Sequence, residues 1–316
     1  MYDIKLTDKA GNSTIVQSGT NCKLVEDANG NKIPVPNGFS PITTNDQGTK
    51  ETGFVIKNDT DGNEYVWVPV DDTTTYSYNR YAFTRDNWEY AQTKGEYDGT
   101  TNSYKIIMGS YDYTEAMPSI DVTRTELNSV NAYKGFYIGR YEIGVIGILD
   151  KSDMIDNYTA PNETWTGYSN GTAVVQEGKQ VWNYITRDKA REVAESMYSD
   201  NDAIISRLCS SYAWDTALKF IETQNSTYPT NSVGGYYDQS EPSTTGYDTV
   251  HPCNIYDMGG NVYEWTTEVS SYTRTPCTLR GGGYYDYASN YPAAYRCNIS
   301  ATYANAYFGF RSTLYL

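Results

Sequence analysis

The residue types that most often carry out chemistry are sparse in this chain of 316 residues. The single histidine, His251, excludes metal sites with several histidines, and any Ser-His-Asp arrangement would have to use it. Its flanks, DTVHPCN, are typical of a loop. Five cysteines are present, with no CxxC pair and no zinc-like spacing: Cys22, Cys209, Cys253, Cys277 and Cys297. This scattered, odd set leaves one or two disulfides open.

Alternating oxygen-bearing side chains occur in GFVIKNDTDGNEYVWVPV, at residues 53–70. Asp59, Asp61 and Asn63 have the spacing that opens a calcium-binding loop, but the full EF-hand pattern is absent. Two runs of β-branched and aromatic residues flank the Asp-Gly-Asn sequence, a pattern typical of a β-hairpin. A plain turn is therefore the preferred interpretation, and a calcium loop is the alternative.

The stretch from Gly281 to Arg311, GGGYYDYASNYPAAYRCNISATYANAYFGFR, has an unusual composition. It is crowded with Tyr, Asn, Ser and Ala, and it lacks Lys, Glu, Gln, Met and Trp, which all occur elsewhere in the chain. Tyrosine offers a large rigid contact surface at a low cost in conformational entropy, and Ser and Asn supply adaptable hydrogen bonds, much as in antibody paratopes. This composition favours a binding surface.

We predict that part of this stretch forms an exposed ligand-binding surface, made of Tyr284, Tyr285, Asp286, Tyr287, Ser289, Asn290, Ala294, Asn298, Ser300, Tyr303, Asn305 and Tyr307. Other side chains are expected to pack inward or to anchor the backbone: Tyr291, Tyr295, Arg296, Phe308 and Phe310. Because the chain as a whole holds 33 Tyr, drift in an acidic, Asn/Ser/Tyr-rich protein is the alternative explanation.

The bulk composition limits the class of protein. With 39% hydrophobic and 15% aromatic residues, the chain is expected to fold around a packed core, as one large domain or two smaller ones. The net charge of −15 argues against binding to nucleic acids or anionic membrane surfaces. No apolar run suggests membrane insertion, and no signal peptide is visible. We therefore expect an intracellular chain, a virion protein or an excised piece of an exported protein.

Several elements must position these residues. Residues 1–52 are interpreted as an N-terminal β appendage or linker, and residues 71–130 as mostly irregular. Residues 135–149 predict a strand, and residues 225–250 a long surface loop. Apolar stripes with i, i+3, i+4, i+7 spacing predict two helices, which begin after Thr186 and after Ser210 or Ser211. Strands dominate, so the predicted fold class is α+β.

Six motifs, in their order along the chain, resemble those of the formylglycine-generating-enzyme (sulfatase-modifying-factor) family: EYVWVPV, FYIGRYEIG, ISRLCSSYAWDTALKF, NIYDMGGNVYEWT, TLRGGGYY and YRC…FGFR. The resemblance covers residues 53–316, with Cys209 in place of a proline in the third motif. It implies the C-type-lectin-like fold of this family, a mixed β-sheet with two helices and much irregular structure. The predicted domain therefore spans residues 53–316. The terminal stretch at about 281–311, identified below as a variable region, lies within it.

In members of this family the segment matching YDMGGNVYEW holds a calcium ion. The resemblance implies that the ligands here are the Asp257 side chain, the carbonyls of Gly260 and Val262, and the Glu264 carboxylate. Oxygen ligands of this kind suit Ca²⁺. The alternative is that Asp257 caps a turn and Glu264 pairs with Arg280 or Arg311.

The family's chemistry uses two cysteines that bind copper and activate oxygen. Counting back from Cys297, the matching positions hold Tyr287 and Pro292, and neither can supply a thiolate to Cu(I). No copper is therefore expected, and the chain is predicted not to be an enzyme. The alternative is a copper-dependent formylglycine-generating oxidase with displaced cysteines.

The terminal stretch resembles the variable region of a second group with this fold, the variable proteins of diversity-generating retroelements. In that group, adenines of a template repeat are miscopied. An AAC or AAT codon can then become any codon with the same last base, a set that excludes Lys, Glu, Gln, Met and Trp. The resemblance implies a ligand-binding protein on a bacterial surface or a phage virion, with a protein or glycan partner on another cell or virus. An invariant structural pseudo-enzyme is the alternative.

Overall fold

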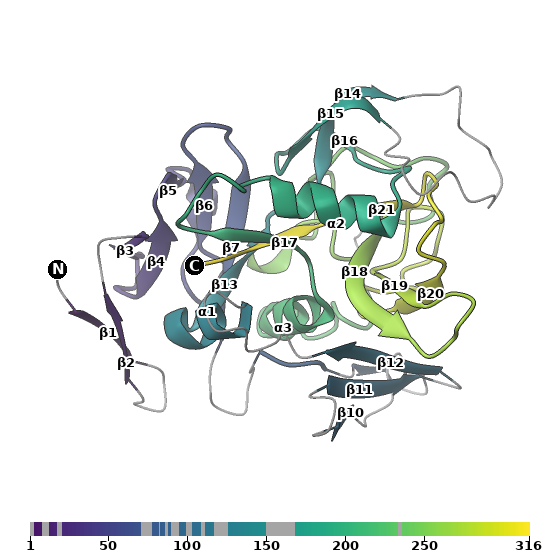
Figure 1. Cartoon of the computed structure of the whole chain (residues 1–316), viewed down its shortest axis with the longest axis horizontal. Coiled ribbons are helices and arrows are strands. Elements are labelled where there is room, and N and C mark those ends of the chain that lie inside the picture. Colours follow the sequence, from purple (N-terminus) through teal and green to yellow (C-terminus); the bar gives the residue numbers. More distant parts are fainter. Residues whose placement is uncertain are drawn as a thin grey trace.

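The computed structural model describes residues 3–7, 13–17, 21–70, 78–81, 83–85, 88–89, 95–98, 103–108, 111–116, 126–149, 168–232 and 236–316. Within these residues, strands outnumber helices and the helices lie between strands in the sequence, which confirms the α+β class. Two larger sheets organise the molecule (Figure 1). No helix in the described ranges has the length and apolarity needed to span a bilayer.

The first sheet has six strands in the order β17-β22-β13-β7-β6-β5. Their bounds are Ile205–Leu208, Ser312–Tyr315, Gly135–Gly139, Glu64–Pro69, Val55–Asn58 and Phe39–Pro41. The β6 and β7 strands pair in antiparallel register around residues 59–63, which confirms the predicted hairpin. Successive side chains of β7 point to opposite faces, so Trp67 enters one core cluster and Val66 the other.

Helices cover both faces of this sheet. The predicted helices are confirmed as α2 (Arg187–Ser196) and α3 (Ser211–Glu222), and the Ser210 hydroxyl caps α3 by accepting from the Ala213 backbone N–H. Ala190 of α2 packs into the cluster that holds Trp67, whereas Leu218 of α3 packs into the cluster that holds Val66. The core therefore consists of two layers, one on each side of the six-stranded sheet.

A third helix, α1 (Glu126–Tyr133), was not predicted. It buries little more than Ser129 and Val130, so its short sequence carries no apolar stripe from which a helix could be recognised. Residues 71–130 are also richer in strands than predicted, with the described part containing β8 (Thr84–Arg85) to β12 (Tyr111–Ala116). These strands pair mostly with their neighbours in the sequence, β8 with β9, β10 with β11 and β11 with β12, and β12 also pairs with the distant β18.

The second sheet carries the terminal segment. Its strands follow the order β10-β11-β12-β18-β19-β20, and β21 pairs with β18 in parallel, so the sheet is mixed. The bounds are Gly95–Asp98, Ser103–Met108, Tyr111–Ala116, Tyr263–Ser270, Cys277–Arg280, Arg296–Ile299 and, for β21, Phe308–Phe310. In Figure 1 this sheet and the C-terminal loops lie on the right, opposite the six-stranded sheet's β5 and β6.

Residues 135–149 were predicted as a single strand, and this prediction is wrong because the chain bends within them. The chain forms two strands, β13 and β14 (Gly144–Leu149), and the latter joins a small sheet with β15 (Tyr168–Val174) and β16 (Gln180–Val181). Between them the chain bends, because buried Arg140 pairs with Glu64 at 2.9 Å and the Ile143 N–H donates to the Phe310 carbonyl. These tertiary contacts end the strand within an apolar run.

The N-terminal residues form hairpins β1-β2 (Asp3–Thr7, Ser13–Gln17) and β3-β4 (Cys22–Glu26, Lys32–Pro36). Beyond them, β5 pairs with β6 of the main sheet, and Ile33 and Val35 are fully buried. The division of the chain at residue 53 stays a prediction. The described residues of 225–250, which are 225–232 and 236–250, contain no regular strand, as predicted, but Tyr228 and Thr245 are buried rather than on the surface.

Candidate functional site

The terminal segment, residues 281–311, alternates between the surface and the core. It leaves β19, forms a loop at residues 285–290, dips into the core at residues 292–294 and returns along β20. A second loop at residues 300–307 leads into buried β21. The segment therefore has two surface-accessible loops separated by a buried stretch.

The first loop, 285–290, carries the most exposed side chains of the segment. Tyr285 and Tyr287 are 68% and 58% exposed, and Ser289 and Asn290 are also exposed. Asp286 shapes this loop, because its carboxylate accepts from the Gly283 backbone N–H at 2.9 Å. These five predicted surface residues are therefore accessible to a ligand.

The second group of predicted surface residues is half-buried. Tyr307 packs under the first loop, with its ring 5.2 Å from that of Tyr284 in a stacked arrangement. Asn298 donates to the Thr275 hydroxyl at 2.7 Å, and Asn305 accepts from the Tyr307 backbone N–H at 2.9 Å. This group also includes Ser300 and Tyr303. Its side chains are only partly exposed to solvent.

Two predicted surface residues are buried, which corrects the sequence-based assignment. Tyr284 is 4% exposed because it stacks on Tyr307 and its carbonyl accepts from the Gln239 N–H. Ala294 is fully buried because its N–H donates to the Pro229 carbonyl at 2.9 Å. Tyr284 comes directly before the exposed Tyr285, whereas Ala294 continues the buried stretch of Pro292 and Ala293.

The buried stretch between the loops is fixed by α3 and by the residue 225–232 region. The Trp214 indole N–H donates to the Ala293 carbonyl at 2.9 Å, and the Ala293 N–H donates to the Ser232 hydroxyl at 2.9 Å. Pro292 is buried as well. The backbone between the two loops is thereby held by the side chains of Trp214 and Ser232. No exposed side chain of the segment takes part in these hydrogen bonds.

Below the loops lies a buried network of arginines and carboxylates. Arg280 and Arg296 face each other across β19 and β20, and both bind Asp215 of α3, at 2.7 Å and 2.5 Å. Arg296 also bonds Glu268 of β18 through its Nε at 3.1 Å, and Arg80 pairs with Glu268. Every one of these side chains is fully buried.

Charge compensation explains the protonation states in this network. Burial alone would raise the pKa of Asp215, but the charges of Arg280, Arg296 and Arg80 hold it below its usual value. Burial, followed by the charge of Arg296, lowers the pKa of Arg280 to about 10. Both groups therefore stay ionised at neutral pH and tie α3 to the sheet that carries the terminal segment.

A third buried arginine, Arg311, is the last residue of the segment. Arg311 binds both carboxylate oxygens of Glu264 and donates to the carbonyls of Gly139 and Tyr256, each at 2.8 Å. Phe308 and Phe310 on either side of Gly309 are buried. The predicted inward packing of Arg296, Phe308 and Phe310 therefore matches their position, whereas Tyr291 and Tyr295 are half-buried.

Of the four residues predicted as calcium ligands, Glu264 makes the ion pair that the sequence left as the alternative. The Asp257 carboxylate accepts from the Gly246 N–H at 2.7 Å, and Glu264 is occupied by Arg311. The Val262 N–H and the side chain of Asn261 donate to Glu142, which the sequence did not single out. Gly260 adopts φ 90° against the Tyr236 backbone.

No group of three or more His, Cys, Asp and Glu side chains in the described ranges is placed to hold a metal ion. The buried Oδ1 atom of Asp257, however, has no hydrogen-bond partner among the described residues. Burial, followed by the charges of Asp257 and Glu264, also raises the pKa of Glu142 well above its usual value. Calcium remains a prediction.

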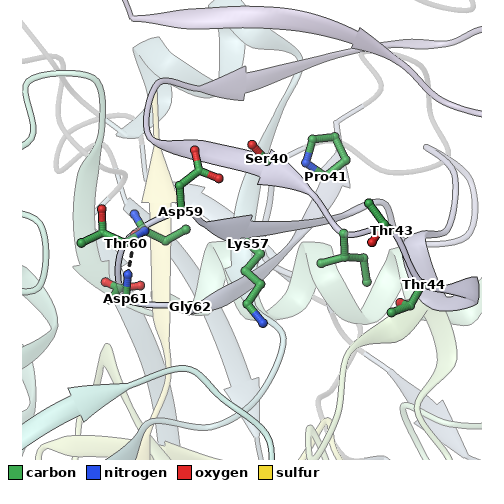
Figure 2. A pocket seen from close by; sticks show the side chains of 11 residues that line it. Ser40, Pro41, Thr43, Thr44, Lys57, Asp59, Thr60, Asp61 and Gly62 are labelled. Carbon is green, nitrogen blue, oxygen red and sulfur yellow. Dashed lines mark hydrogen bonds between the residues drawn. The ribbon is translucent and has the colours of Figure 1, made fainter.

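The other calcium candidate is a turn. Asp61 accepts from the Asn63 N–H, while the Asn63 amide donates to Tyr198 and accepts from the Val175 N–H. Next to this turn lies an open cavity of about 460 Å³. Figure 2 shows Lys57, Asp59 and neighbouring polar residues around it. The hydrogen bonds support the plain turn that the sequence favoured.

Most of the thiols are shielded from solvent. Four of the five cysteines are buried, and no disulfide joins them. Burial, followed by the charge of Asp286, raises the pKa of Cys297 to about 11. Tyr287 is exposed and Pro292 is buried at the positions where the resemblance places the copper ligands.

Comparison with solved structures gives distant likenesses. PvdO from Pseudomonas aeruginosa shares 14% identity over 84% of this chain and 99% of that chain, with a TM-score of 0.41. Treponema denticola variable protein 1 shares 14% identity over 68% of this chain and 99% of that chain, with a TM-score of 0.35. CarF shares 15% identity over 58% and 87% of the two chains, with a TM-score of 0.38. No functional conclusion rests on these likenesses.

The sequence itself gives a firmer match. No curated protein matches the chain, but residues 168–314 match the family model of the sulfatase-modifying factor enzyme 1-like domain. This range contains the YDMGGNVYEW motif, the terminal segment and its three anchoring arginines. The resemblance seen in the motifs is confirmed for this part of the chain, since residues 168–314 are similar to the sulfatase-modifying factor enzyme 1-like domain.

Proposed function

We propose that this protein binds a ligand through the two loops of the terminal segment and that a retroelement diversifies their side chains. The observation that carries the proposal is the separation of roles within residues 281–311. Side chains at 285–290 are largely exposed, whereas the backbone is anchored by Arg280, Arg296 and Arg311. Exchange of the exposed side chains leaves these buried contacts in place.

The codon set supports the same reading. Lys, Glu, Gln, Met and Trp are absent from residues 281–311, and these are the types that variation of AAC or AAT codons cannot reach. Variation within that set can place Tyr, Ser, Asn or Asp on the loops, which are useful types in a binding surface. On this proposal, positions 285–290 and 298–307 vary, and positions 292–296 and 308–311 stay constant.

We propose further that the chain is not an enzyme. An oxidase of this family needs two reactive thiolates at one centre, and a thiol with a pKa of about 11 is protonated at neutral pH. The proposed partner is a protein or glycan on another cell or virus, and the proposed place of display is a bacterial surface or a phage virion. The many tyrosines would act as anchors within a polar rim.

Sequencing the gene and its neighbourhood in sister isolates tests the diversification. We expect a nearby reverse transcriptase gene and an imperfect repeat of the segment that encodes residues 281–311, differing at adenines. Substitutions among isolates should fall at positions 285–290 and 298–307. Substitutions spread evenly over the chain, or concentrated at Arg296 and Arg311, would contradict the proposal.

An activity assay tests the rival function. The purified protein is incubated with copper and a cysteine-containing peptide, and peptide oxidation is followed by mass spectrometry. We expect no turnover above that of a heat-denatured control. Turnover that disappears in Cys297→Ser or Cys277→Ser would establish the oxidase and overturn the non-enzymatic proposal.

A further inference from the structure

A loop outside the terminal segment adjoins the exposed residues. In this 236–247 loop, the Gln239 N–H donates to the Tyr284 carbonyl at 2.7 Å, and the Asp238 N–H donates to the Asp286 carbonyl at 2.9 Å. The two backbones therefore run together at the base of the 285–290 loop. The two loops adjoin each other, although residues 248–284 separate them in the sequence.

The 236–247 loop is fixed from its other side by the YDMGGNVYEW motif. The Asn261 N–H donates to the Tyr236 carbonyl at 2.8 Å, and the Asn261 side chain accepts from the Ser243 N–H at 2.9 Å. A Cβ atom at Gly260 would lie 2.6 Å from the Tyr236 carbonyl oxygen, so this position must stay glycine. The loop is therefore a rigid neighbour of the terminal segment.

Aromatic rings are exposed on both parts of this surface. Tyr247 is 60% exposed, and its ring meets that of Tyr236 edge to face at 5.1 Å. Tyr285 and Tyr287 are comparably exposed on the terminal segment. Isolated exposed tyrosines are ordinary, but several on adjoining loops offer ring faces that attract cations.

The formal charges on this surface are all negative. Asp238 and Glu241 are exposed and Asp286 is half-buried, while residues 236–247 contain no Lys or Arg. The one arginine in residues 281–307, Arg296, is turned inward and neutralised by carboxylates. Beside the loop, Lys179, whose backbone N–H donates to Thr245, and Glu177 carry one formal charge of each sign.

From this combination we propose that the 236–247 loop is a constant second half of the recognition face and that the face binds an Arg- or Lys-rich protein segment. The carboxylates would pair with the cationic groups while the tyrosine rings receive them by cation–π contact. This inference rests on the proposed ligand-binding function and names the chemical class of its ligand. The constant 236–247 loop would favour cationic ligands in general. The variable side chains of the terminal segment would then determine which basic partner binds.

The test measures binding of a fluorescent peptide of alternating Gly and Arg to the intact protein by fluorescence anisotropy at physiological salt. Three peptides of the same length serve for comparison, with Lys, citrulline or Glu in place of Arg. We expect saturable binding of the Arg and Lys peptides, with Kd at least about tenfold lower than for the citrulline and Glu peptides. Failure of the Arg peptide to bind overturns the inference.

Matched variants separate this face from the general attraction of an acidic protein. The double variant D238N/E241Q removes two carboxylates from the face, and D59N/D200N removes two exposed carboxylates elsewhere. We expect the first to weaken Arg-peptide binding about tenfold and the second less than about twofold. Equal weakening by both would show long-range attraction only and would overturn the inference.

Truncation of an aromatic ring tests the second component. Tyr247→Ala is expected to weaken binding about fivefold, whereas Ile148→Ala, which truncates another exposed apolar side chain, should leave it unchanged. Both variants are checked for an unchanged urea unfolding midpoint. If Tyr247→Ala leaves the Kd of the Arg peptide unchanged, the 236–247 loop is not part of the face.

The outcomes distinguish this inference from the proposed function. Binding that depends on Asp238, Glu241 and Tyr247 stands even if isolates show no variation within residues 281–311, in which case only the diversification fails. Conversely, concentrated variation together with binding of neutral oligosaccharides, but not of the Arg peptide, keeps the proposed function and overturns the cationic ligand.

Discussion

The 285–290 loop and the strands β19 and β20 belong to the same short part of the chain, but they meet opposite environments. The loop exposes Tyr285 and Tyr287, whereas the strands bury Arg280 and Arg296 against Asp215 and Glu268. A surface whose side chains can be exchanged needs a backbone held by contacts that those side chains do not make. The buried ion pairs and the backbone hydrogen bonds of residues 292–294 supply such contacts.

The largest effect is expected from the buried side of this comparison. Arg296→Ala leaves Asp215 and Glu268 undercompensated in the interior, because one of their shared cations is lost. The free energy of unfolding should fall by about 3–5 kcal/mol. Urea denaturation followed by tryptophan fluorescence measures it. The control is Arg274→Ala at an exposed position, and similar losses in both would mean that the network does not anchor the segment.

A smaller effect is expected at the turn that starts the loop. Gly282 has φ 75°, and an added Cβ atom would lie 2.2 Å from the Tyr291 carbonyl oxygen. Gly282→Ala should therefore cost roughly 2–4 kcal/mol of unfolding free energy. Gly178→Ala is the matched control, because Gly178 has φ 70° with nothing near the added atom, and about 1 kcal/mol is expected there. If Gly282→Ala and Gly178→Ala cost the same unfolding free energy, the cost would come from the positive φ angle alone and not from the contact with Tyr291.

The exposed side of the comparison should tolerate change. Tyr285→Ala and Tyr287→Ala remove side chains that contribute little to the core, so each should change the unfolding free energy by no more than about 0.5 kcal/mol. Tyr284→Ala, one residue earlier, removes a buried stacked ring and should cost about 3 kcal/mol. A large loss at Tyr287 would show that the loop packs against itself and is not freely replaceable.

The smallest effect is expected in thiol chemistry. Because burial and the charge of Asp286 raise the pKa of Cys297 to about 11, only about one thiol in a thousand is ionised at pH 8. Alkylation by iodoacetamide, followed by mass spectrometry of the native protein, should stay slow at pH 8 and accelerate as the pH rises toward 11. The urea-unfolded protein provides the fast reference. Rapid labelling of native Cys297 at pH 7 would reopen the enzymatic alternative.

Local patterns were sufficient for the elements with strong periodicity. The hairpin of β6 and β7 follows from two β-branched and aromatic runs around a turn, and the helices α2 and α3 follow from apolar residues at helical spacing. The family motifs likewise predicted the similarity that the family model finds over residues 168–314. Inward packing of Arg296, Phe308 and Phe310 was also predicted correctly, since charged or aromatic residues next to strand motifs tend to anchor them.

The sequence by itself determined which residues are available for a face, whereas only the tertiary structure decided which of them reach it. Tyr284 and Ala294 were predicted at the surface but are buried, Tyr284 against Tyr307 later in the segment and Ala294 against the backbone of Pro229. The pairing of Arg311 with Glu264 and the approach of the 236–247 loop to Tyr284 are equally nonlocal. In irregular segments burial has no period, because it is set by whatever packs against each position after folding.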